Sequence, residues 1–387
     1  CEILEDGRYT TLIANPPYLG MRKAKDPLKR FANKHYKRSS TDLCTMFIER
    51  AASLAQRRGA IGMITMHAWM FLDSYRELRP WMLSAMSIDS MAHLGTRAFD
   101  SIGGEVVQTT AFTTTNASCD ADRAGVYLRL VDGRNEAEKA QLLREAARNN
   151  AHDLRFETSA STLAVIPGRP IVYWASQEML DAFATGTPLG EIAPAKQGLA
   201  TADNERFLRQ WFEVSADRSD MRVRDREDAL ASGARWFPYN KGGQFRKWWG
   251  NQDCVVNWES DGYLIRSFVD SESGKLRSRP QNLDFYFRPS VSWSKVTAGA
   301  IAFRSYPKGF IFDVAGTSLY ANALAKNMEI LALVNSSVAF NVLSMIAPTV
   351  NFEVGQIAAI PCIEPGNFNL APVERLIEIF RTDWDAR

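Results

Sequence analysis

The stretch that decides the fold runs from residue 9 to residue 18 and reads Tyr-Thr-Thr-Leu-Ile-Ala-Asn-Pro-Pro-Tyr. Its first six residues are apolar, aromatic or β-branched, which predicts a strand over residues 9–14. The strand must end at Asn15, because Pro16 and Pro17 have no backbone N–H to donate to a neighbouring strand. A rigid polar loop, Asn15-Pro16-Pro17-Tyr18, is therefore expected directly after a buried strand.

The residues that follow this loop predict an α/β region. The basic stretch to Lys37 is expected to be a loop, and Ser40-Thr41-Asp42 is suited to cap a helix that Gly59 ends. Further strands are predicted over 60–66, 88–94, 106–115 and 126–131, with helices over 73–86, where Pro80 delays or bends the start, and 136–149. Alternation of strands and helices is typical of a parallel α/β sheet.

After about residue 160 the sequence changes character, and eight of the ten tryptophans follow. Short β-favouring runs at 255–258, 290–294, 300–303 and 310–313, with helices at 177–183, 327–343 and 372–384, predict an α+β region. We therefore expect two domains, residues 1–160 and 161–387.

Composition excludes several classes of protein. The five cysteines are scattered through 387 residues with no short Cys-Cys or Cys-His spacing. This argues against a disulfide framework and a zinc site, so no metal is expected, and it fits a reducing cytoplasm. No apolar stretch reaches the length of a membrane span, so a cytoplasmic protein without a membrane partner is predicted.

The net charge is only +2, but cations are concentrated locally. Residues 22–38 hold eight lysines and arginines against one acid, Asp26, and residues 235–249 and 277–308 are also basic. A single run of this kind is usually a solvated face. Three runs, two of them rich in aromatic residues, favour a polyanionic partner.

The Asn15–Tyr18 loop suits methylation of an exocyclic base amine. The lone pair of the adenine amino nitrogen is delocalised into the ring, so two acceptors must draw the amino hydrogens to one side. The side-chain oxygen of Asn15 and the carbonyl of Pro16 are placed to do so, Pro17 helps to fix the backbone, and the ring of Tyr18 can clamp the base. The base must leave the duplex to reach them. The alternative is a rigid turn that merely ends the strand.

With its surroundings, this motif resembles the PglX adenine methyltransferases of bacterial BREX phage-defence systems. The resemblance covers nearly the whole chain and extends to restriction-modification enzymes that carry methyltransferase and target-recognition parts on one polypeptide. The stretches that carry it are Ile13-Ala14-Asn15-Pro16-Pro17-Tyr18-Leu19-Gly20, Thr41-Asp42-Leu43, Met46-Phe47-Ile48-Glu49-Arg50, Gly62-Met63-Ile64-Thr65-Met66, Trp69-Met70-Phe71-Leu72, residues 91–107, Trp236-Phe237-Pro238-Tyr239-Asn240-Lys241-Gly242-Gly243, Phe245-Arg246-Lys247-Trp248 and Ser292-Trp293-Ser294-Lys295.

The resemblance implies a partial Rossmann-like methyltransferase sheet over residues 1–160 and a target-recognition domain over 161–387. It implies S-adenosylmethionine as methyl donor, adenine in double-stranded DNA as acceptor, and other phage-defence proteins as possible partners. Such enzymes hold the donor with an aromatic-x-Gly-x-Gly loop, which we expect upstream of Cys1, with Asn15 bordering the donor. Gly103-Gly104 and Gly242-Gly243 lack the strand-loop-helix setting of such a loop. This chain alone is therefore expected to be inactive.

The resemblance also implies DNA contacts. Residues 196–204 resemble the opening motif of a target-recognition domain, with Ala202 where the family usually has glycine. Phosphate and base contacts are expected from two groups of polar side chains. The phosphate-binding candidates are Lys23, Lys25, Lys196, Arg235, Lys241, Arg246, Lys247, Lys295 and Arg304, and the base-reading candidates are Gln197, Asn204, Asn240 and Gln244.

Other readings remain open. His67 and His93 lie in apolar surroundings and are predicted to be satisfied core histidines. The Asn-Pro-Pro-Tyr motif also serves methyltransferases that act on RNA bases or on protein glutamine, although the long second region argues against these smaller enzymes. The chain could instead work chiefly as the DNA-recognition module of a defence complex.

Overall fold

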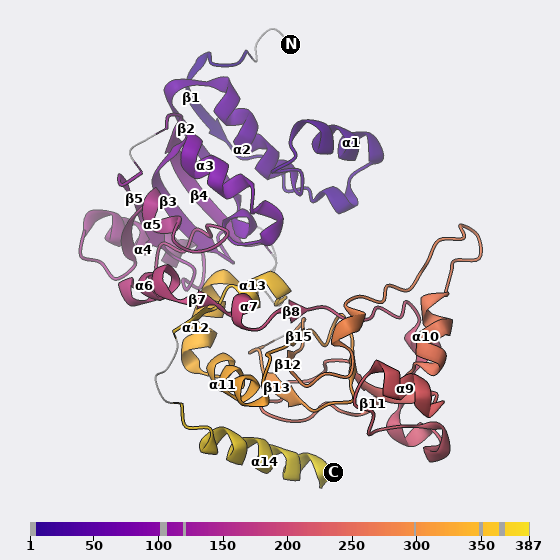
Figure 1. The fold of residues 1–387 in the computed structure, drawn as a ribbon. Helices are drawn as coiled ribbons and strands as arrows, with labels where there is room; N and C mark the ends of the chain where they lie inside the picture. Colours follow the sequence, from indigo (N-terminus) through magenta and orange to yellow (C-terminus); the bar gives the residue numbers. More distant parts are fainter. Residues whose placement is uncertain are drawn as a thin grey trace. The chain divides into compact units, whose positions relative to one another are not determined.

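The computed structural model describes residues 5–100, 107–118, 121–297, 299–347, 351–363 and 368–386. The chain forms two compact units, Cys1–Ala184 and Thr185–Arg387 (Figure 1). This division lies after the predicted boundary at 160/161, because the segment that follows residue 160 packs on unit 1. Within it, the Ile171 N–H donates to the Met70 carbonyl at 2.9 Å.

Unit 1 is built around a six-stranded sheet with the order β1-β2-β4-β3-β5-β6. Its strands are β1 (Tyr9–Ala14), β2 (Ala55–Met66), β3 (Ser87–Gly95), β4 (Thr109–Thr115), β5 (Ala124–Arg129) and β6 (Arg155–Ser159). Its helices are α1 (Asp26–His35), α2 (Leu43–Leu54), α3 (Leu78–Ala85), α4 (Glu136–Arg148), α5 (Ala160–Leu163) and α6 (Gln177–Thr185), with short 3₁₀ turns at Met21–Lys23, His67–Met70 and Asp73–Tyr75.

The prediction of a parallel sheet is wrong for β4, and no strand was predicted where β6 lies. Strand β4 runs antiparallel to both β2 and β3, and β6 runs antiparallel to β5. A parallel neighbour needs a crossover connection, usually a helix, and none was predicted between the strands now numbered β3 and β4. Strands β1 and β2 are parallel, and β2 and β3 share one direction because each pairs antiparallel with β4. The carboxyl ends of β1, β2 and β3 therefore meet at one edge.

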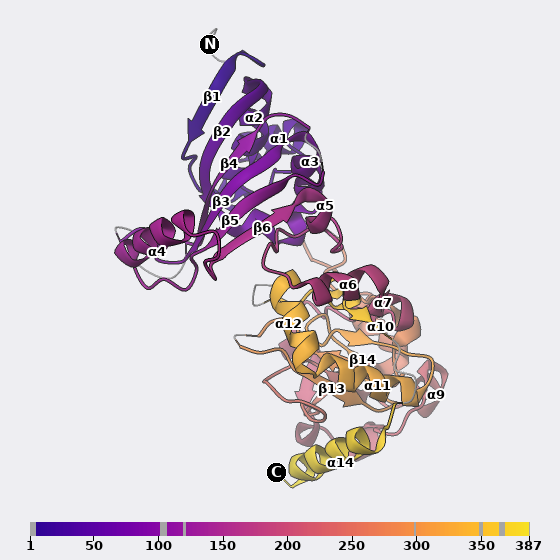
Figure 2. The ribbon, with the colours of Figure 1, turned by 90° about the vertical axis from the view of Figure 1, so that its left-hand side faces the viewer.

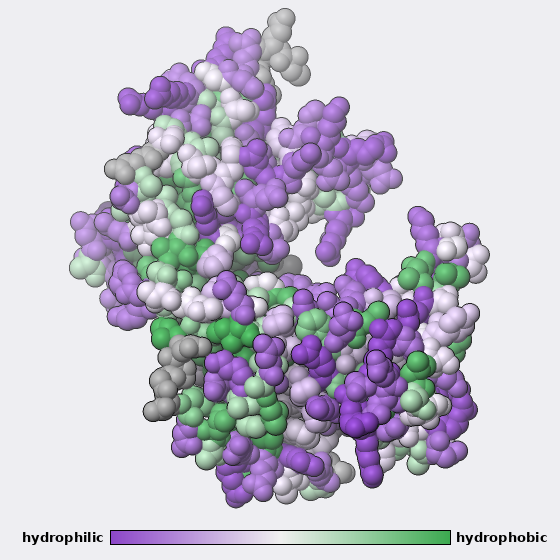
Figure 3. Space-filling model, in the orientation of Figure 1, coloured by the Kyte–Doolittle hydropathy of each residue, from purple (hydrophilic) through white to green (hydrophobic). Residues whose placement is uncertain are grey.

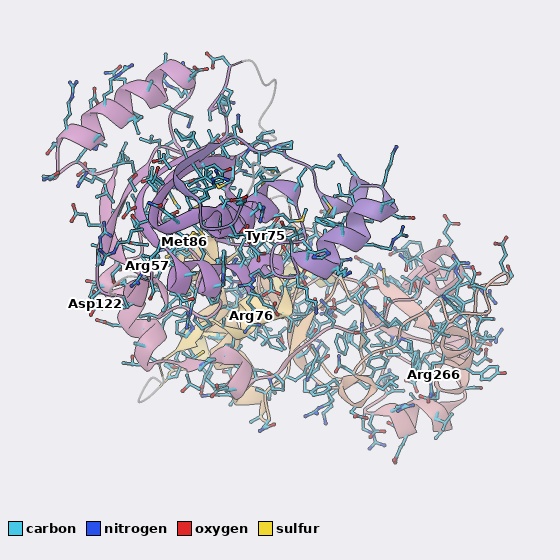
Figure 4. All side chains as sticks on the ribbon, turned by 90° about the horizontal axis from the view of Figure 1, so that it is seen from above. Arg57, Tyr75, Arg76, Met86, Asp122 and Arg266 are labelled. Atoms are coloured by element: carbon cyan, nitrogen blue, oxygen red, sulfur yellow. The ribbon has the colours of Figure 1, made fainter. Side chains whose placement is uncertain are left out.

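The two faces of this sheet differ. Helices α2 and α3 lie along one face (Figures 1 and 2), with Tyr75 and Met86 buried in the unit (Figure 4). Side chains of all six strands and of α4 line a hollow of about 720 Å³ on the sheet, with Asn15 among the lining residues. The hollow adjoins the edge strand β1, whose Ile13 is 86% exposed.

The prediction that the basic stretch is a loop is also wrong, because it contains helix α1. Pro27 occupies the first turn, where its missing N–H costs nothing. Ala32 packs with Met21 and Met46 in a small separate core. The predicted cap of the next helix is confirmed: the Asp42 side chain accepts from the Cys44 N–H at 2.9 Å and α2 begins at Leu43.

Unit 2 contains small sheets with the orders β14-β10-β11-β9, β13-β12-β15-β8 and β16-β7. Its strands are β7 (Thr187–Pro188), β8 (Ala195–Lys196), β9 (Leu208–Gln210), β10 (Trp236–Asn240), β11 (Cys254–Asn257), β12 (Ser290–Trp293), β13 (Phe303–Tyr306), β14 (Ile311–Phe312), β15 (Ser318–Leu319) and β16 (Pro361–Cys362). Its helices are α7 (Leu189–Ile192), α8 (Asn204–Phe207), α9 (Arg226–Ser232), α10 (Glu259–Arg266), α11 (Leu324–Val334), α12 (Ser337–Ile346), α13 (Val354–Ala358) and α14 (Ala371–Asp385).

The helix predicted over 327–343 is two helices, α11 and α12. They meet at an angle of 69°. At the break Ser336 caps α12 by accepting from the Ala339 N–H at 3.1 Å. In the described ranges no single helix has both the length and the apolar character of a membrane span. The bent pair α11–α12 meets those criteria only when its two helices are taken together.

The half-buried His67 and the buried His93 form a hydrogen-bonded chain with the buried Tyr173. His67 Nδ1 lies 2.8 Å from His93 Nε2, and His93 Nδ1 lies 3.0 Å from the Tyr173 hydroxyl. The prediction of satisfied core histidines is thereby confirmed. Burial lowers the pKa of His67 to about 4, and burial, with help from the neighbouring His67, Arg129 and Lys139, lowers the pKa of His93 to about 3.

These shifts predict acid sensitivity. Both histidines stay neutral in the folded state while the unfolded chain takes up protons near pH 6.5. The free energy of unfolding should therefore fall as pH drops from 6.5 towards 4, by about 1.4 kcal/mol per pH unit for each histidine. Urea unfolding between pH 7.5 and 5 measures this slope. His93→Gln should reduce it and His35→Gln, on exposed α1, should leave it unchanged; an equal slope in both variants would contradict the assignment.

Candidate active site and DNA-facing residues

The Asn15–Tyr18 loop leaves β1 at the carboxyl edge of the sheet. Asn15 and Pro17 are exposed, Pro16 is buried and Tyr18 is half-buried. Pro16 thus anchors the loop in the protein while the Asn15 amide, on the rim of the hollow, is open to a ligand. This arrangement places an exposed acceptor beside a backbone whose conformation two prolines restrict.

Asp42 fixes the far side of this loop. One carboxylate oxygen accepts from the Cys44 N–H at 2.9 Å and from the Leu19 N–H at 3.3 Å. The Leu43 N–H donates to the Leu19 carbonyl at 3.0 Å. The sequence predicted Asp42 as a helix cap, but not its second hydrogen bond. That bond could not be predicted from a local pattern, because Leu19 and Asp42 are 23 residues apart in the sequence.

Tyr18 is held next to the same carboxylate. Burial, with smaller contributions from Cys44 and Asp42, raises the pKa of the Tyr18 phenol. The ring therefore stays neutral at physiological pH and presents an uncharged aromatic surface, which suits stacking on a base.

Cations beside the loop are open to solvent. Lys23 and Lys25 are both exposed, at the start of the segment that contains α1. Figure 3 shows strongly hydrophilic residues covering this projecting segment. Among the described residues, no three His, Cys, Asp or Glu side chains are grouped to hold a metal ion.

In unit 2 the structure brings several candidates together around carboxylates. Lys241 Nζ lies 2.6 Å from the Asp313 carboxylate and 3.5 Å from the Asn204 side-chain oxygen. Lys295 Nζ lies 2.9 Å from Glu353, and Gln197 donates to the same carboxylate at 3.4 Å. The charges of Lys241 and Lys295 are therefore partly neutralised within the protein.

The remaining candidates of unit 2 lie against aromatic rings or carbonyls. Lys196 lies over Phe285 and Arg246 over Trp384, 5.2 and 4.8 Å from the ring centroids. Lys247 donates to the Asn335 carbonyl at 3.1 Å. Arg235 lies over Trp236, and Gln244 is exposed.

Two predicted DNA contacts are corrected because the structure buries them. Arg304 is 0% exposed and donates to the Arg246 carbonyl and the Ser294 hydroxyl at 3.3 and 3.1 Å. Asn240 is 1% exposed, and its amide donates to Ser292 and to the Gly316 carbonyl at 2.7 and 2.9 Å. Neither side chain is free to meet a phosphate or a base edge, since both hold the core of unit 2.

The segment of residues 196–204 has backbone requirements of its own. A Cβ at Gly198 would lie 1.8 Å from the Phe312 carbonyl oxygen, so this position requires glycine. Ala202, where the resemblance leads one to expect glycine, has a φ of 62°. The left-handed backbone is therefore kept although alanine disfavours it, by about 1 kcal/mol.

The described residues lack the glycine-rich loop expected of a site that binds the methyl donor. No strand is followed by an aromatic-x-Gly-x-Gly sequence, which occurs nowhere in the chain. Gly242 and Gly243 follow β10, and no helix begins directly after them. The predicted statement about Gly103 and Gly104 lies outside the described residues. The hollow beside Asn15 is lined mainly by apolar side chains.

Comparison with known proteins assigns the class. Residues 1–99, which include β1, β2 and β3, match the family model "Eco57I restriction-modification methylase". More particularly, the chain is a homologue of the adenine-specific methyltransferases PglX and BrxX. It is 38% identical over 381 residues to PglX of Lacticaseibacillus casei (strain Zhang) and 37% identical over 383 residues to BrxX of Escherichia coli O9:H4 (strain HS).

These alignments cover 98% of this chain, but only 31% of PglX and 30% of BrxX. The chain therefore spans less than a third of the length of these relatives.

Solved structures share the fold at low sequence identity. The Type IIL restriction-modification enzyme MmeI, in complex with DNA, is 12% identical with a TM-score of 0.56, over 100% of this chain and 50% of that chain. The Type ISP enzyme LlaGI, a nuclease-deletion mutant with a DNA substrate mimic, is 12% identical with a TM-score of 0.50, over 96% and 34%. The likeness confirms the predicted fold class.

The double role of Asp42 predicts a specific effect of its removal. Asp42→Ala should lower the free energy of unfolding by about 1–2 kcal/mol through loss of the cap. It should also lower methylation by the full-length protein, because Leu19 and the loop before it lose their anchor. Asp42→Asn keeps an acceptor oxygen and should restore most of both. Equal defects in the two variants would show that the negative charge, rather than the hydrogen bonds, matters.

The burial of Asn240 predicts a structural rather than a DNA-reading role. Asn240→Ala removes the donor to the Ser292 hydroxyl and the Gly316 carbonyl and leaves the Gly242 N–H without its acceptor. It should destabilise the protein by about 1–3 kcal/mol in urea unfolding. Exposed Asn322→Ala, in the same unit, is the control and should change stability by less than about 0.5 kcal/mol. A normally stable Asn240→Ala protein with altered DNA sequence preference would instead favour base reading.

Proposed function

We propose that this chain supplies the amine-binding loop and the DNA-contacting part of a site-specific DNA methyltransferase. The enzyme transfers a methyl group to the exocyclic amino group of adenine in duplex DNA, within a phage-defence or restriction-modification system. The observation that carries the proposal is the exposed Asn15 amide on a proline-restricted loop at the open edge of the sheet.

The loop activates the amine through acceptors. The Asn15 side-chain oxygen and the Pro16 carbonyl accept the two amino hydrogens, which concentrates the nitrogen lone pair on the side of the incoming methyl group. The neutral Tyr18 ring stacks on the extruded base and offsets part of the cost of unstacking it. Because Pro16 is buried and Asp42 holds Leu19, the acceptors are positioned before the base arrives.

Homology to methyltransferases implies S-adenosylmethionine as the methyl donor. The described residues lack the loop expected to bind that molecule. We therefore assign them to binding of the adenine that accepts the methyl group.

DNA contacts are proposed for the candidates whose side chains reach the surface. Lys23 and Lys25 contact the backbone near the target base. In unit 2, Lys196, Gln197, Asn204, Lys241, Arg246, Lys247 and Lys295 remain proposed contacts. The pairs with Asp313 and Glu353 mean that Lys241 and Lys295 must exchange a carboxylate for a phosphate, which reduces what each adds to affinity.

The proposal predicts that Asn15→Ala and Tyr18→Ala abolish methylation by the full-length protein while DNA binding survives. Loss of an acceptor aligned with the reacting group should lower the rate at least about 100-fold. Long-read sequencing of host DNA measures adenine methylation, and a gel shift with the methylated site measures binding. Asn150→Ala, exposed in the same unit, is the matched control.

Unchanged host methylation in the Asn15→Ala strain would refute the proposal. Phage protection that persists without methylation would instead support the alternative, a DNA-recognition module of a defence complex.

A further inference from the structure

The surface of α1 combines dense positive charge with an exposed aromatic ring. Six of the eight cations of residues 22–38 are exposed, namely Arg22, Lys23, Lys25, Arg30, Lys34 and Lys37. The other two have acidic neighbours: Lys29 lies 4.0 Å from Asp26, and Arg38 lies 3.1 Å from Glu49. The charge of this segment is therefore mostly unneutralised.

Phe31 lies in the middle of this charge and points away from the core. Its side chain is 51% exposed, whereas Ala32, the next residue, is fully buried against Met21 and Met46. The Phe31 ring centroid lies 4.7 Å from that of His35, one turn further along the helix, and 6.0 Å from that of Tyr36. The Phe31 ring therefore packs on neighbouring rings at the surface and is not part of the small core of Met21, Ala32 and Met46.

The segment is coupled to the proposed catalytic loop. Leu19 follows Tyr18 directly and is hydrogen-bonded to Asp42 and Leu43, and the Met21 N–H donates to the Thr41 carbonyl at 2.9 Å. The segment that contains α1 thus begins and ends at the same place, where Leu19 and Met21 are hydrogen-bonded to residues 41–43 beside the loop. The packing of Ala32 on Met21 and Met46 further ties α1 to α2, which Asp42 caps beside the loop.

We propose that residues 22–38 grip the DNA backbone beside the target adenine and that Phe31 inserts into the stack to fill the space left by the extruded base. The inference rests on the proposed function and deepens it. Apolar side chains that wedge into a base step occur where neighbouring cations hold the backbone close. The exposed ring and its flanking cations supply both parts on a single helix.

The test uses the full-length protein and two duplexes that contain its methylation site. One carries adenine at the target position and measures turnover, and the other carries 2-aminopurine there and measures extrusion. The fluorescence of 2-aminopurine rises when the base leaves the stack. The test variant is Phe31→Ala, and the matched control is Phe47→Ala, an exposed phenylalanine of α2, 41% exposed, outside the segment. Far-ultraviolet circular dichroism and urea unfolding confirm that both variants fold.

We expect Phe31→Ala to lose most of the fluorescence rise and at least about tenfold in kcat, with less than a threefold change in Kd. Phe47→Ala should behave as the wild-type protein. A mismatch opposite the target adenine already weakens the stack and should restore turnover to Phe31→Ala. That rescue separates insertion into DNA from a structural role.

Normal extrusion and turnover in Phe31→Ala would overturn the inference. So would a loss of turnover that the mismatch does not restore, which would indicate that Phe31 contacts another part of the protein. If the wild-type protein neither extrudes nor methylates the adenine, the proposed function itself fails, and this inference with it.

The charge has a separate readout. The double variant Lys34→Ala/Lys37→Ala should weaken duplex binding equally for specific and unrelated sequences. It should also reduce the slope of log K against log salt concentration by about two. An unchanged slope would show that these cations do not contact phosphates and would remove the backbone grip from the inference.

Discussion

The arrangement of the proposed active site depends on the two hydrogen bonds that the Asp42 carboxylate accepts, from the Leu19 and Cys44 N–H groups. This carboxylate is largely buried, at the amino terminus of α2, where unpaired N–H groups and the helix dipole favour a negative charge. Because the same oxygen also holds the Leu19 N–H, the start of α2 and the end of the Asn15–Tyr18 loop cannot move independently. The segment that contains α1 leaves and returns at this point.

The same principle, a buried acceptor that organises donors, operates in unit 2 with a different outcome. Asp313 accepts from the Tyr239 hydroxyl at 2.7 Å and from Lys241, and the Ala315 N–H donates to it at 2.7 Å. Here the carboxylate forms an ion pair with Lys241, which the sequence analysis predicted to contact DNA. On α1, by contrast, a single aspartate faces many cations. More unneutralised positive charge therefore remains on α1 than around Asp313 in unit 2. Release of counterions, which favours binding of cations to DNA, should accordingly be greater for α1.

Sequence reasoning succeeded where short-range rules decide the structure. The proline pair ends β1 at Ala14, Asp42 caps α2, and Glu136 begins α4 as predicted. It failed where partners distant in the chain decide. The direction of β4 depends on strands on both sides of it, and the helical state of α1 depends on Met21 and Met46, which lie outside it.

Burial of polar residues is the second limit. Asn240 and Arg304 look like ligands for DNA in a sequence, because asparagine and arginine are the usual side chains for base edges and phosphates. In the fold their hydrogen bonds satisfy carbonyls and hydroxyls of neighbouring strands and loops. Nothing in the local pattern distinguishes the two uses, since both require the same donors.

At the carboxyl edge of the sheet in unit 1, some polar residues are open to a ligand and others are engaged in packing. The end of β1 presents Asn15 to solvent, whereas the residue after β2, His67, and the late β3 residue His93 are bonded to each other and held neutral. Two imidazoles are thus present at this edge, but burial lowers their pKa to about 4 for His67 and about 3 for His93. In the proposed function, the amine at the β1 end is activated by the neutral acceptors of Asn15 and Pro16. Such acceptors suit methyl transfer to an amine, because the nitrogen lone pair has to be directed toward the methyl group before the proton leaves.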